Sequence, residues 1–184
     1  KQDLRVDLHS FSEPHDVVTT HLDLDVEVDF EKEVISGVAQ YQIENKTGSK
    51  QLVLDANGLR IDKVTSQEED CSFHLSEKDS ILGQALIIDI EKDTKEVSIF
   101  YRSAPKSKAL QWLNPNQTAG KKHPFLFTQS QAILARTWIP CQDSPGVRFS
   151  YTAKVKVPAD LLAVMSAENP MEKNNTGIYH FKME

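Results

Sequence analysis

The sequence predicts an all-β protein built of mostly antiparallel strands, with low helix content. From Leu22 to Phe30, apolar residues occupy every even position and acidic residues every odd one, which is typical of a strand with one buried and one solvated face. Further short β-rich runs follow at intervals of about 10 residues, a spacing typical of an all-β sandwich or barrel. No stretch sustains a helical apolar repeat over three turns, so we expect little helix.

The first hairpin has the clearest pattern of all the expected elements. We predict a strand over 22–30, a turn at 31–33 and a second strand over 34–43. Gly37 interrupts the second of these strands, and we interpret it as a bulge.

The remaining strands are short and separated by turn-forming residues. Asn57 and Gly58 mark a tight turn, and Pro158 ends an alternating run that begins at Tyr151. We expect these strands over 51–55, 61–64, 71–75, 85–90, 97–101, 151–157, 163–166 and 178–181.

The stretch 103–150 differs from the rest, because prolines interrupt it and aromatic and amide side chains concentrate there. Long irregular segments on a rigid sheet are where binding residues tend to lie. Large aromatic residues are usually buried, so we predict that Phe125, Phe127 and Trp138 fill core between sheets. The glutamines of this stretch have no reason to enter a core unless their amides are hydrogen-bonded, so they are candidates for binding.

Length and composition exclude several classes of protein. The chain has 184 residues, the size of one large domain or two very small ones. Its net charge of −6 and the lack of a clustered run of Lys and Arg argue against a nucleic-acid partner. No apolar run approaches the ~18–20 residues that cross a bilayer, so we expect no membrane span.

The two cysteines, Cys71 and Cys141, bear on the cellular compartment. A chain of this length buries enough surface to fold without a disulfide, so we expect reduced thiols and a cytoplasmic protein. The first residues are polar and contain no apolar signal-peptide core. A periplasmic or exported protein whose leader has been removed is the alternative.

The sequence contains no familiar catalytic or metal-binding motif. Its histidines include no pair at the helical spacing of a zinc site, and its cysteines form no C-x-x-C. The acidic row of Asp23, Asp25, Glu27 and Asp29 is interpreted as a solvated sheet face, because alternate side chains stand about 7 Å apart and cannot share one ion. Spacing alone therefore predicts no catalytic residue and no metal ligand in this chain.

Four polar residues between 127 and 145 are the candidate site residues. In an extended chain Gln129 and Gln131 point to the same face, so two amides converge on one ligand. Arg136 and Asp143 are predicted to pair across a turn as a charge-assisted structural clamp. Such a pair either pins the loop or contacts a ligand directly, and the first interpretation is preferred because buried charges are normally paired.

This region resembles the amino-terminal domain of the zinc aminopeptidases of the aminopeptidase N family. The resemblance is carried by residues 112–121, by 123–132, and by 135–136 together with 139–145. Within the family the likeness is to the leukotriene hydrolase/aminopeptidase branch, which has a paired Gln-x-Gln-Ala and a Gln-Trp-Leu-x-Pro-x-Gln-Thr-x-Gly pattern. The likeness extends over nearly the whole chain.

The resemblance implies that 1–184 is the amino-terminal all-β domain of a larger metallopeptidase, a saddle-like β-sandwich that covers a catalytic domain of the same chain. It implies a peptide substrate, with Gln131 near the free amino terminus of that peptide and Gln129 in the same pocket. The zinc motif H-E-x-x-H lies downstream in the family and is absent from this sequence. Zinc is therefore expected in the parent enzyme only, and we expect this domain alone to lack peptidase activity.

A second class of protein remains open: a free-standing β-sandwich module that binds a peptide or glycan through its glutamine- and aromatic-rich segment. The aminopeptidase interpretation requires a reading frame that continues into H-E-x-x-H. It also predicts an exposed apolar patch, of the size that marks an interface, where the catalytic domain docks. A self-contained module should have no such patch.

Overall fold

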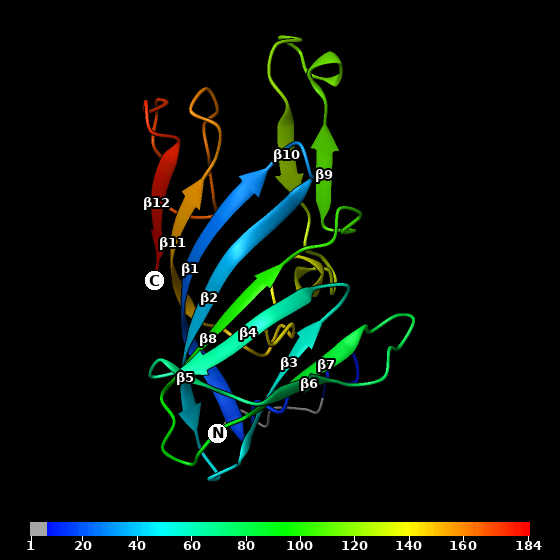
Figure 1. The fold of residues 1–184 in the computed structure, drawn as a ribbon, viewed down its shortest axis with the longest axis vertical. Helices are drawn as coiled ribbons and strands as arrows, with labels where there is room; N and C mark the ends of the chain where they lie inside the picture. Colours follow the sequence, from blue (N-terminus) through cyan, green and yellow to red (C-terminus); the bar gives the residue numbers. More distant parts are fainter. Residues whose placement is uncertain (1–6) are drawn as a thin grey trace.

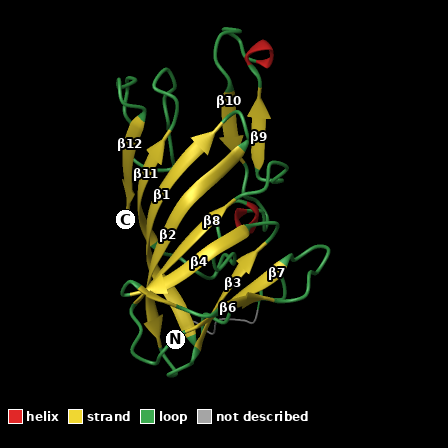
Figure 2. Cartoon of the chain, in the orientation of Figure 1, coloured by secondary structure: helices red, strands yellow, loops and turns green. Residues whose placement is uncertain are grey.

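A computed structural model describes residues 7–184 and confirms the all-β prediction. Strands make up 45% of the described residues and helix 3%, and Figure 2 shows the two helical turns, η1 (Pro115–Gln117) and η2 (Ala135–Thr137), as isolated features. The strands are β1 (Val17–Asp29), β2 (Val34–Asn45), β3 (Gln51–Ala56), β4 (Arg60–Ser66), β5 (Glu69–Asp70), β6 (Phe73–Leu75), β7 (Gln84–Asp89), β8 (Glu96–Arg102), β9 (Leu110–Leu113), β10 (Phe125–Thr128), β11 (Ser150–Lys156) and β12 (Ile178–Met183).

The strands form three sheets of different size. The largest is a twisted seven-stranded sheet in the order β12-β11-β1-β2-β8-β4-β5. A three-stranded sheet, β3-β7-β6, lies near one end of it, and the two-stranded sheet β9-β10 projects at the other end (Figure 1). This arrangement agrees with a β-sandwich.

The predicted first hairpin is present and is longer than the sequence pattern indicated. The even-numbered apolar residues of β1 face the core, with Leu22, Leu24 and Val26 each at most 5% exposed. The turn is stabilised by Asp29, whose Oδ1 accepts hydrogen bonds from the backbone N–H groups of residues 31 and 32 at 3.0 and 2.9 Å.

The prediction that Gly37 forms a bulge is wrong. Gly37 pairs in register with Val26, and the irregularity between β1 and β2 lies instead between Thr19 and His21. Gly37 has a φ of +156°, and a Cβ at this position would lie 2.0 Å from the carbonyl oxygen of Asp25. A glycine is needed here because the neighbouring backbone approaches too closely for any side chain.

The other edge of β1 pairs with β11 in parallel, from His21 beside Ser150 to Glu27 beside Lys156. The other named strand pairs are antiparallel, as predicted. On the outer face, Lys156 Nζ lies 3.1 Å from Glu27 Oε1, and Lys154 Nζ lies 3.1 Å from Asp25 Oδ2. The acidic row of β1 therefore forms cross-strand ion pairs with β11.

The hydrophobic core lies between the inner face of the large sheet and the three-stranded sheet. Its fully buried side chains from both sheets include Tyr41, Val97 and Ile99 on one side and Leu52, Leu54, Leu86 and Ile88 on the other. The hydroxyl of Tyr41 donates a hydrogen bond to the carbonyl of Pro140. This bond connects the segment that follows η2 directly to the core.

The strand predicted over 163–166 is absent, because a side chain takes the place of a neighbouring strand. The Asn169 side chain accepts from Met165 N and donates to the carbonyls of Met165 and Ala167, each at 2.8 Å. Such side-chain bonds compete with sheet pairing for the backbone groups. The reverse error is the hairpin β9–β10, which lies in the stretch that the sequence indicated was irregular.

Cys71 and Cys141 are both free thiols, and Cys141 is buried. Burial raises the pKa of the Cys141 thiol well above its usual value, so the thiolate is suppressed there. Among residues 7–184, no helix is long and apolar enough to cross a membrane.

Candidate functional site

The β9–β10 hairpin rests on the body of the protein through one of its two faces. Trp112 and Leu126 lie directly opposite each other on this inner face and pack against the core. The ring of Trp112 meets Phe30, at the end of β1, edge to face with centroids 5.3 Å apart. The hairpin is therefore held against the β1–β2 turn and presents its other face outward.

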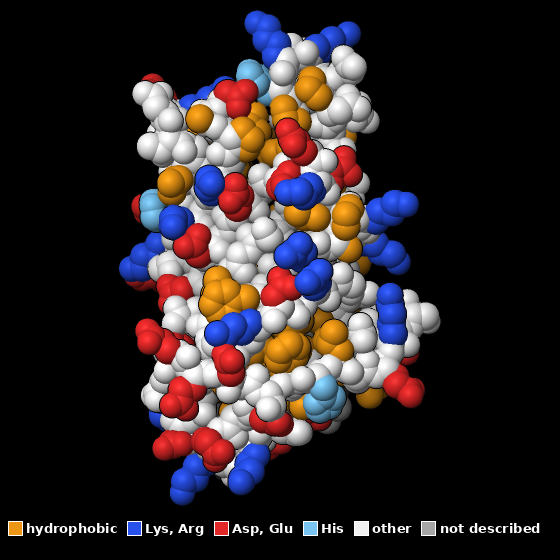
Figure 3. All heavy atoms as spheres, viewed as in Figure 1, with side chains coloured by type: hydrophobic (Ala, Val, Ile, Leu, Met, Phe, Trp, Pro, Cys, Tyr) orange, Lys and Arg blue, Asp and Glu red, His pale blue; other side chains and the backbone are white. Residues whose placement is uncertain are grey.

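The outer face of the hairpin is aromatic and exposed. Phe125 and Phe127 are 52% and 44% exposed, and their ring centroids lie 6.1 Å apart. Leu113 and Gln111 lie opposite them on β9, and Figure 3 shows hydrophobic side chains on the surface of this hairpin. The prediction that Phe125 and Phe127 fill core is wrong, because their alternation with inward-facing residues turns them away from the sheets. Trp138, in contrast, is partly buried against the core.

The two candidate glutamines follow β10 at the base of this hairpin. Gln129 continues the pairing by one residue, because its N–H donates to the carbonyl of Ala109 at 2.8 Å. The chain then turns, and Gln131 N donates to the side-chain Oε1 of Gln129 at 3.1 Å. Both glutamines are exposed. They do not share the face of an extended strand as expected, but this hydrogen bond brings them together in a turn.

The turn that carries the glutamines is attached to the protein by several hydrogen bonds. Trp138 Nε1 donates to Ser130 Oγ at 3.2 Å, from the residue between the two glutamines. The Thr137 hydroxyl donates to the carbonyl of Leu134 at 2.7 Å and accepts from Ser107 at 2.9 Å. These contacts link the turn to η2 and to the segment before β9, so the glutamines stand on an ordered support.

Arg136 lies in η2, the helical turn to which the glutamine segment is attached, and its side chain has no exposed surface. Its Nε lies 3.0 Å from Asp143 Oδ2, and its Nη1 lies 3.4 Å from Asp55 Oδ1. The remaining guanidinium hydrogens are also used, with Nη1 donating to the carbonyl of Leu82 at 3.0 Å and Nη2 to that of His9 at 2.8 Å. Arginine suits this position because its planar group donates several hydrogen bonds in fixed directions.

Asp55, at the end of β3, is the residue of this cluster that the sequence did not reveal. It is completely buried and accepts hydrogen bonds from Ser10 Oγ at 2.5 Å, Phe11 N at 2.7 Å and Asp143 N at 3.0 Å. Burial raises the pKa of the Asp55 carboxyl above its usual value, although the hydrogen bonds and Arg136 act in the opposite direction. The sequence predicts Asp55 only as the last residue of a strand, and the residues that cover it, Ser10, Phe11 and Asp143, are distant in sequence.

The described residues contain no group of three or more His, Cys, Asp or Glu side chains placed to hold a metal ion. Asp55 and Asp143, the buried carboxylates at the site, are already occupied by Arg136 and by backbone N–H groups. Zinc, which the fold family implies, therefore does not fit the residues of this part of the chain.

The fold and the site define a class of protein domain, an all-β sandwich with a projecting aromatic hairpin and two amides at the base of that hairpin. The chain matches the Peptidase M1 N-terminal domain over residues 18–184, and it belongs to this family.

Individual relatives agree with this assignment. Leukotriene A-4 hydrolase of Xenopus laevis is 38% identical over 187 residues, which cover 96% of this chain and 31% of that protein. Leucine aminopeptidase 2 of Saccharomyces cerevisiae is 34% identical over 186 residues, which cover 97% of this chain and 27% of that protein. The chain therefore spans less than a third of the length of these relatives.

Solved structures show the same fold. The structure of native yeast LTA4 hydrolase aligns with 99% of this chain and 29% of its own, with a TM-score of 0.87 and 33% identity. A mutant M1 zinc metallopeptidase of Deinococcus radiodurans aligns with 93% of this chain and 39% of its own, with a TM-score of 0.68. Its identity is 16%, so it shows likeness of fold alone.

Proposed function

We propose that this chain is the non-catalytic amino-terminal domain of a zinc-dependent aminopeptidase that removes amino-terminal residues from peptides. Membership of the Peptidase M1 N-terminal domain family carries the proposal. The names of the relatives, which include leucine aminopeptidase 2 and M1 zinc metallopeptidase, support it. In this proposal the catalytic domain belongs to the same polypeptide and holds the zinc, and the domain alone has no peptidase activity.

The proposed contribution of the domain is to orient the substrate through Gln129 and Gln131. A neutral amide oxygen accepts a hydrogen bond from the ammonium group of a peptide without adding charge to the site. The Oε1 of Gln129 already accepts from Gln131 N, so Gln131 is the better placed of the two to receive the ammonium group. This contact would speed the reaction by positioning the substrate, because a substrate that is already held in the correct orientation loses less translational and rotational entropy on reaching the transition state.

The Arg136–Asp143 clamp acts indirectly in this proposal. Both residues are buried or nearly so, with side chains 0% and 12% exposed, and their polar atoms are turned toward the protein. They hold the segment that carries the glutamines and do not touch the peptide. We also propose a cytoplasmic location, which the two free thiols support.

The experiment is a kinetic comparison in the full-length protein, with aminoacyl-anilide substrates and with and without a zinc chelator. A hydrogen bond to a charged group contributes about 1.5–3 kcal/mol, so Gln131→Ala is expected to lower kcat/KM by roughly 10- to 100-fold. Gln131→Glu is expected to lower KM, because a carboxylate attracts the ammonium group more strongly. Gln51→Ala, at an exposed glutamine on β3, is the matched control.

Three results of this experiment contradict the proposal. A full-length protein that cleaves no aminoacyl-anilide, or whose cleavage is insensitive to the chelator, is not a zinc aminopeptidase. If kcat/KM is unchanged in both Gln129→Ala and Gln131→Ala, neither glutamine contributes to substrate binding. Cleavage by residues 1–184 alone contradicts the non-catalytic role.

A further inference from the structure

A serine, a histidine and an aspartate meet on the outer face of the large sheet, the face turned away from the core. β1 and β11 lie side by side in parallel (Figure 1), and this pairing sets His21 beside Ser150. His21 Nδ1 and Ser150 Oγ lie 2.7 Å apart, which is hydrogen-bond distance. His21 Nε2, on the other side of the ring, lies 3.4 Å from Asp23 Oδ1. The imidazole therefore stands between a hydroxyl and a carboxylate.

A bulge in β1 is the reason why His21 faces outward. Val17 and Thr19, at odd positions, are buried, whereas from Leu22 onward the even positions are buried. The register of the pairing with β2 shifts between Thr19 and His21, and the extra residue there is Thr20. Without this shift His21 would follow Thr19 into the core, because alternate residues of a strand share a face. Bulges redirect side chains in this way and are frequent beside active sites.

Ser150, the first residue of β11, is held in place from the opposite side of its strand. Phe149, the residue before it, packs against the core, with its ring centroid 6.3 Å from that of Tyr41. Successive side chains of an extended chain point to opposite faces, so Ser150 is directed toward His21 on the outer face. Both residues are partly exposed, the His21 side chain by 27%. A small molecule in solution therefore has access to the pair.

These side chains have the parts of a nucleophilic site, namely a hydroxyl, a base within hydrogen-bond reach and a third group that orients the base. A neutral imidazole carries one proton. Asp23 favours that proton on Nε2, because a carboxylate attracts the N–H dipole, and this leaves Nδ1 free to accept from the Ser150 hydroxyl. Asp23 Oδ1 also accepts a hydrogen bond from the Thr152 hydroxyl, which orients the carboxylate. Such a group is recognised by geometry and roles and not by sequence order.

A shallow hollow of about 600 Å³ lies next to this group on the same strands. Asp23 and Thr152 line it, and further polar side chains come from Gln40, Lys154 and His180. Because the hollow is open, the negative charge that develops on a carbonyl oxygen during attack is stabilised mainly by water and not by a set of fixed donors. The arrangement therefore suits esters with a good leaving group, whose cleavage needs the least additional stabilisation.

We propose that Ser150 and His21 form a second reactive site, which hydrolyses activated carboxylic esters such as aryl esters independently of any zinc. Ser150 Oγ bonds to the carbonyl carbon while His21 Nδ1 takes the hydroxyl proton. The bond from that carbon to the phenol oxygen breaks, and His21 returns the proton to this oxygen. Water then attacks the acyl group with His21 as base, and the carboxylic acid leaves as the proton returns to Ser150 Oγ. Asp23 is a positioning residue, because it acts through His21.

The experiment uses the full-length protein in the presence of a zinc chelator, which separates this site from the proposed peptidase site. A fluorophosphonate probe followed by peptide mass spectrometry identifies the labelled serine, and p-nitrophenyl acetate measures ester hydrolysis. Ser150→Ala should abolish both. General-base assistance contributes about 10²–10⁴-fold, so His21→Gln should slow both by roughly 100-fold or more. Asp23→Asn should lower kcat by roughly 10-fold, less than in a buried triad because its side chain is 45% exposed, and Asp23→Glu should restore part of the loss.

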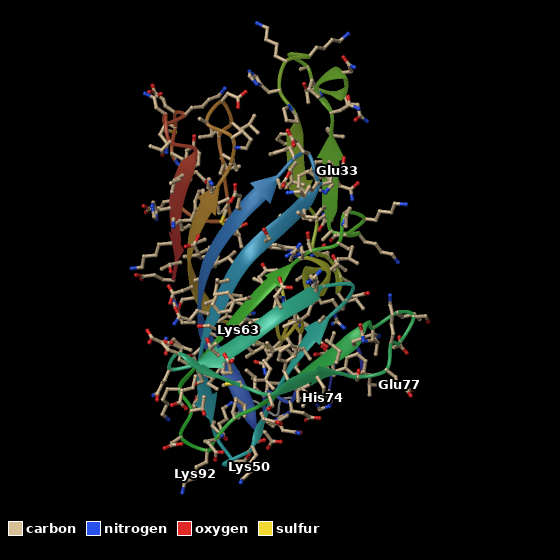
Figure 4. All side chains as sticks on the ribbon, viewed as in Figure 1. Glu33, Lys50, Lys63, His74, Glu77 and Lys92 are labelled. Carbon is tan, nitrogen blue, oxygen red and sulfur yellow. The ribbon has the colours of Figure 1, made fainter. Side chains whose placement is uncertain are left out.

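Ser98→Ala and His74→Gln are the matched controls. Ser98 lies on the same outer face, on β8, where its neighbours in the sheet are Gln40 and Thr65 and not a histidine. His74 is an exposed histidine of β6, in the three-stranded sheet and away from β11 (Figure 4). Both variants should keep the labelling and the hydrolysis of the wild type.

The inference requires an adduct on Ser150 of the wild type, and ester hydrolysis that Ser150→Ala and His21→Gln remove and both controls retain. Mass spectrometry of the labelled wild type does not depend on whether any variant folds, so absence of an adduct on Ser150 overturns the inference by itself. An adduct that forms equally fast in His21→Gln also overturns it, because the histidine is then not the base. None of these outcomes bears on the aminopeptidase function, which is measured without the chelator and with the glutamine variants.

Discussion

Replacing Arg136 with Met is expected to destabilise the domain strongly. Arg136 has no exposed surface, and its guanidinium lies 3.0 Å from Asp143 Oδ2 and 3.4 Å from Asp55 Oδ1. Met has an apolar chain of similar reach, but it leaves two carboxylates without a cation and the carbonyls of Leu82 and His9 without a donor. Removing one partner of a buried pair costs about 3–5 kcal/mol.

The assay is unfolding of the chain followed by circular dichroism, with heat and with urea. For a chain of this size each kcal/mol lowers Tm by about 2–4 °C, so the expected decrease is roughly 6–20 °C. Arg60→Met is the matched control, because Arg60 is 70% exposed with its Nε 2.7 Å from Asp62 Oδ1, and surface pairs contribute about 1 kcal/mol or less. If the two variants lose the same stability within about 1 kcal/mol, the reasoning about the buried cluster is wrong.

Three further predictions concern stability, each measured as the free energy of unfolding in urea. Gly37→Ala should lower the free energy of unfolding by several kcal/mol or prevent folding, because the Cβ of the alanine would lie 2.0 Å from the Asp25 carbonyl oxygen. A decrease of less than about 1 kcal/mol would refute this prediction. Folding raises the pKa of the Asp55 carboxyl above its ordinary value of 3.8, so the folded wild type binds more protons than the unfolded chain. The stability of the wild type relative to Asp55→Asn should therefore fall as pH rises above about 3.8. A relative stability that increases with pH would contradict the direction of the shift. Tyr41→Phe removes a buried hydrogen bond to a backbone carbonyl and should cost about 1–2 kcal/mol, whereas Tyr101→Phe should cost less, because its buried hydroxyl has no hydrogen-bond partner among residues 7–184.

The sheet framework could be predicted because it depends on local alternation of apolar and polar residues. The run from Leu22 to Phe30 predicts a strand whatever its partners are, and β1 covers most of that run. The pairing of β1 with β11 could not be predicted, since alternation says which face is buried and not which strand lies alongside. The strand predicted over 163–166 failed for a different reason, since the Asn169 side chain satisfies the backbone locally.

The site was only partly predictable for similar reasons. Gln129, Gln131, Arg136 and Asp143 lie close together in sequence, so a short segment was enough to indicate them. Asp55 was missed because its burial depends on residues far away in the chain. The same limit applies to the phenylalanines of β10, because hydrophobicity predicts burial only where another element covers the face.

The parallel pairing of β1 with β11 has a consequence for how the chain acquires its structure during synthesis. β1 ends at Asp29 and β11 begins at Ser150, so one edge of β1 has no partner until most of the domain has been translated. Contacts between such distant segments form slowly, because a long loop must close first. An open edge rich in β-forming residues is a template for association with other chains. Nascent or truncated chains that end before β11 are therefore expected to depend on chaperones. The open edge of β1 is covered only when β11 and β12 have been added to the sheet.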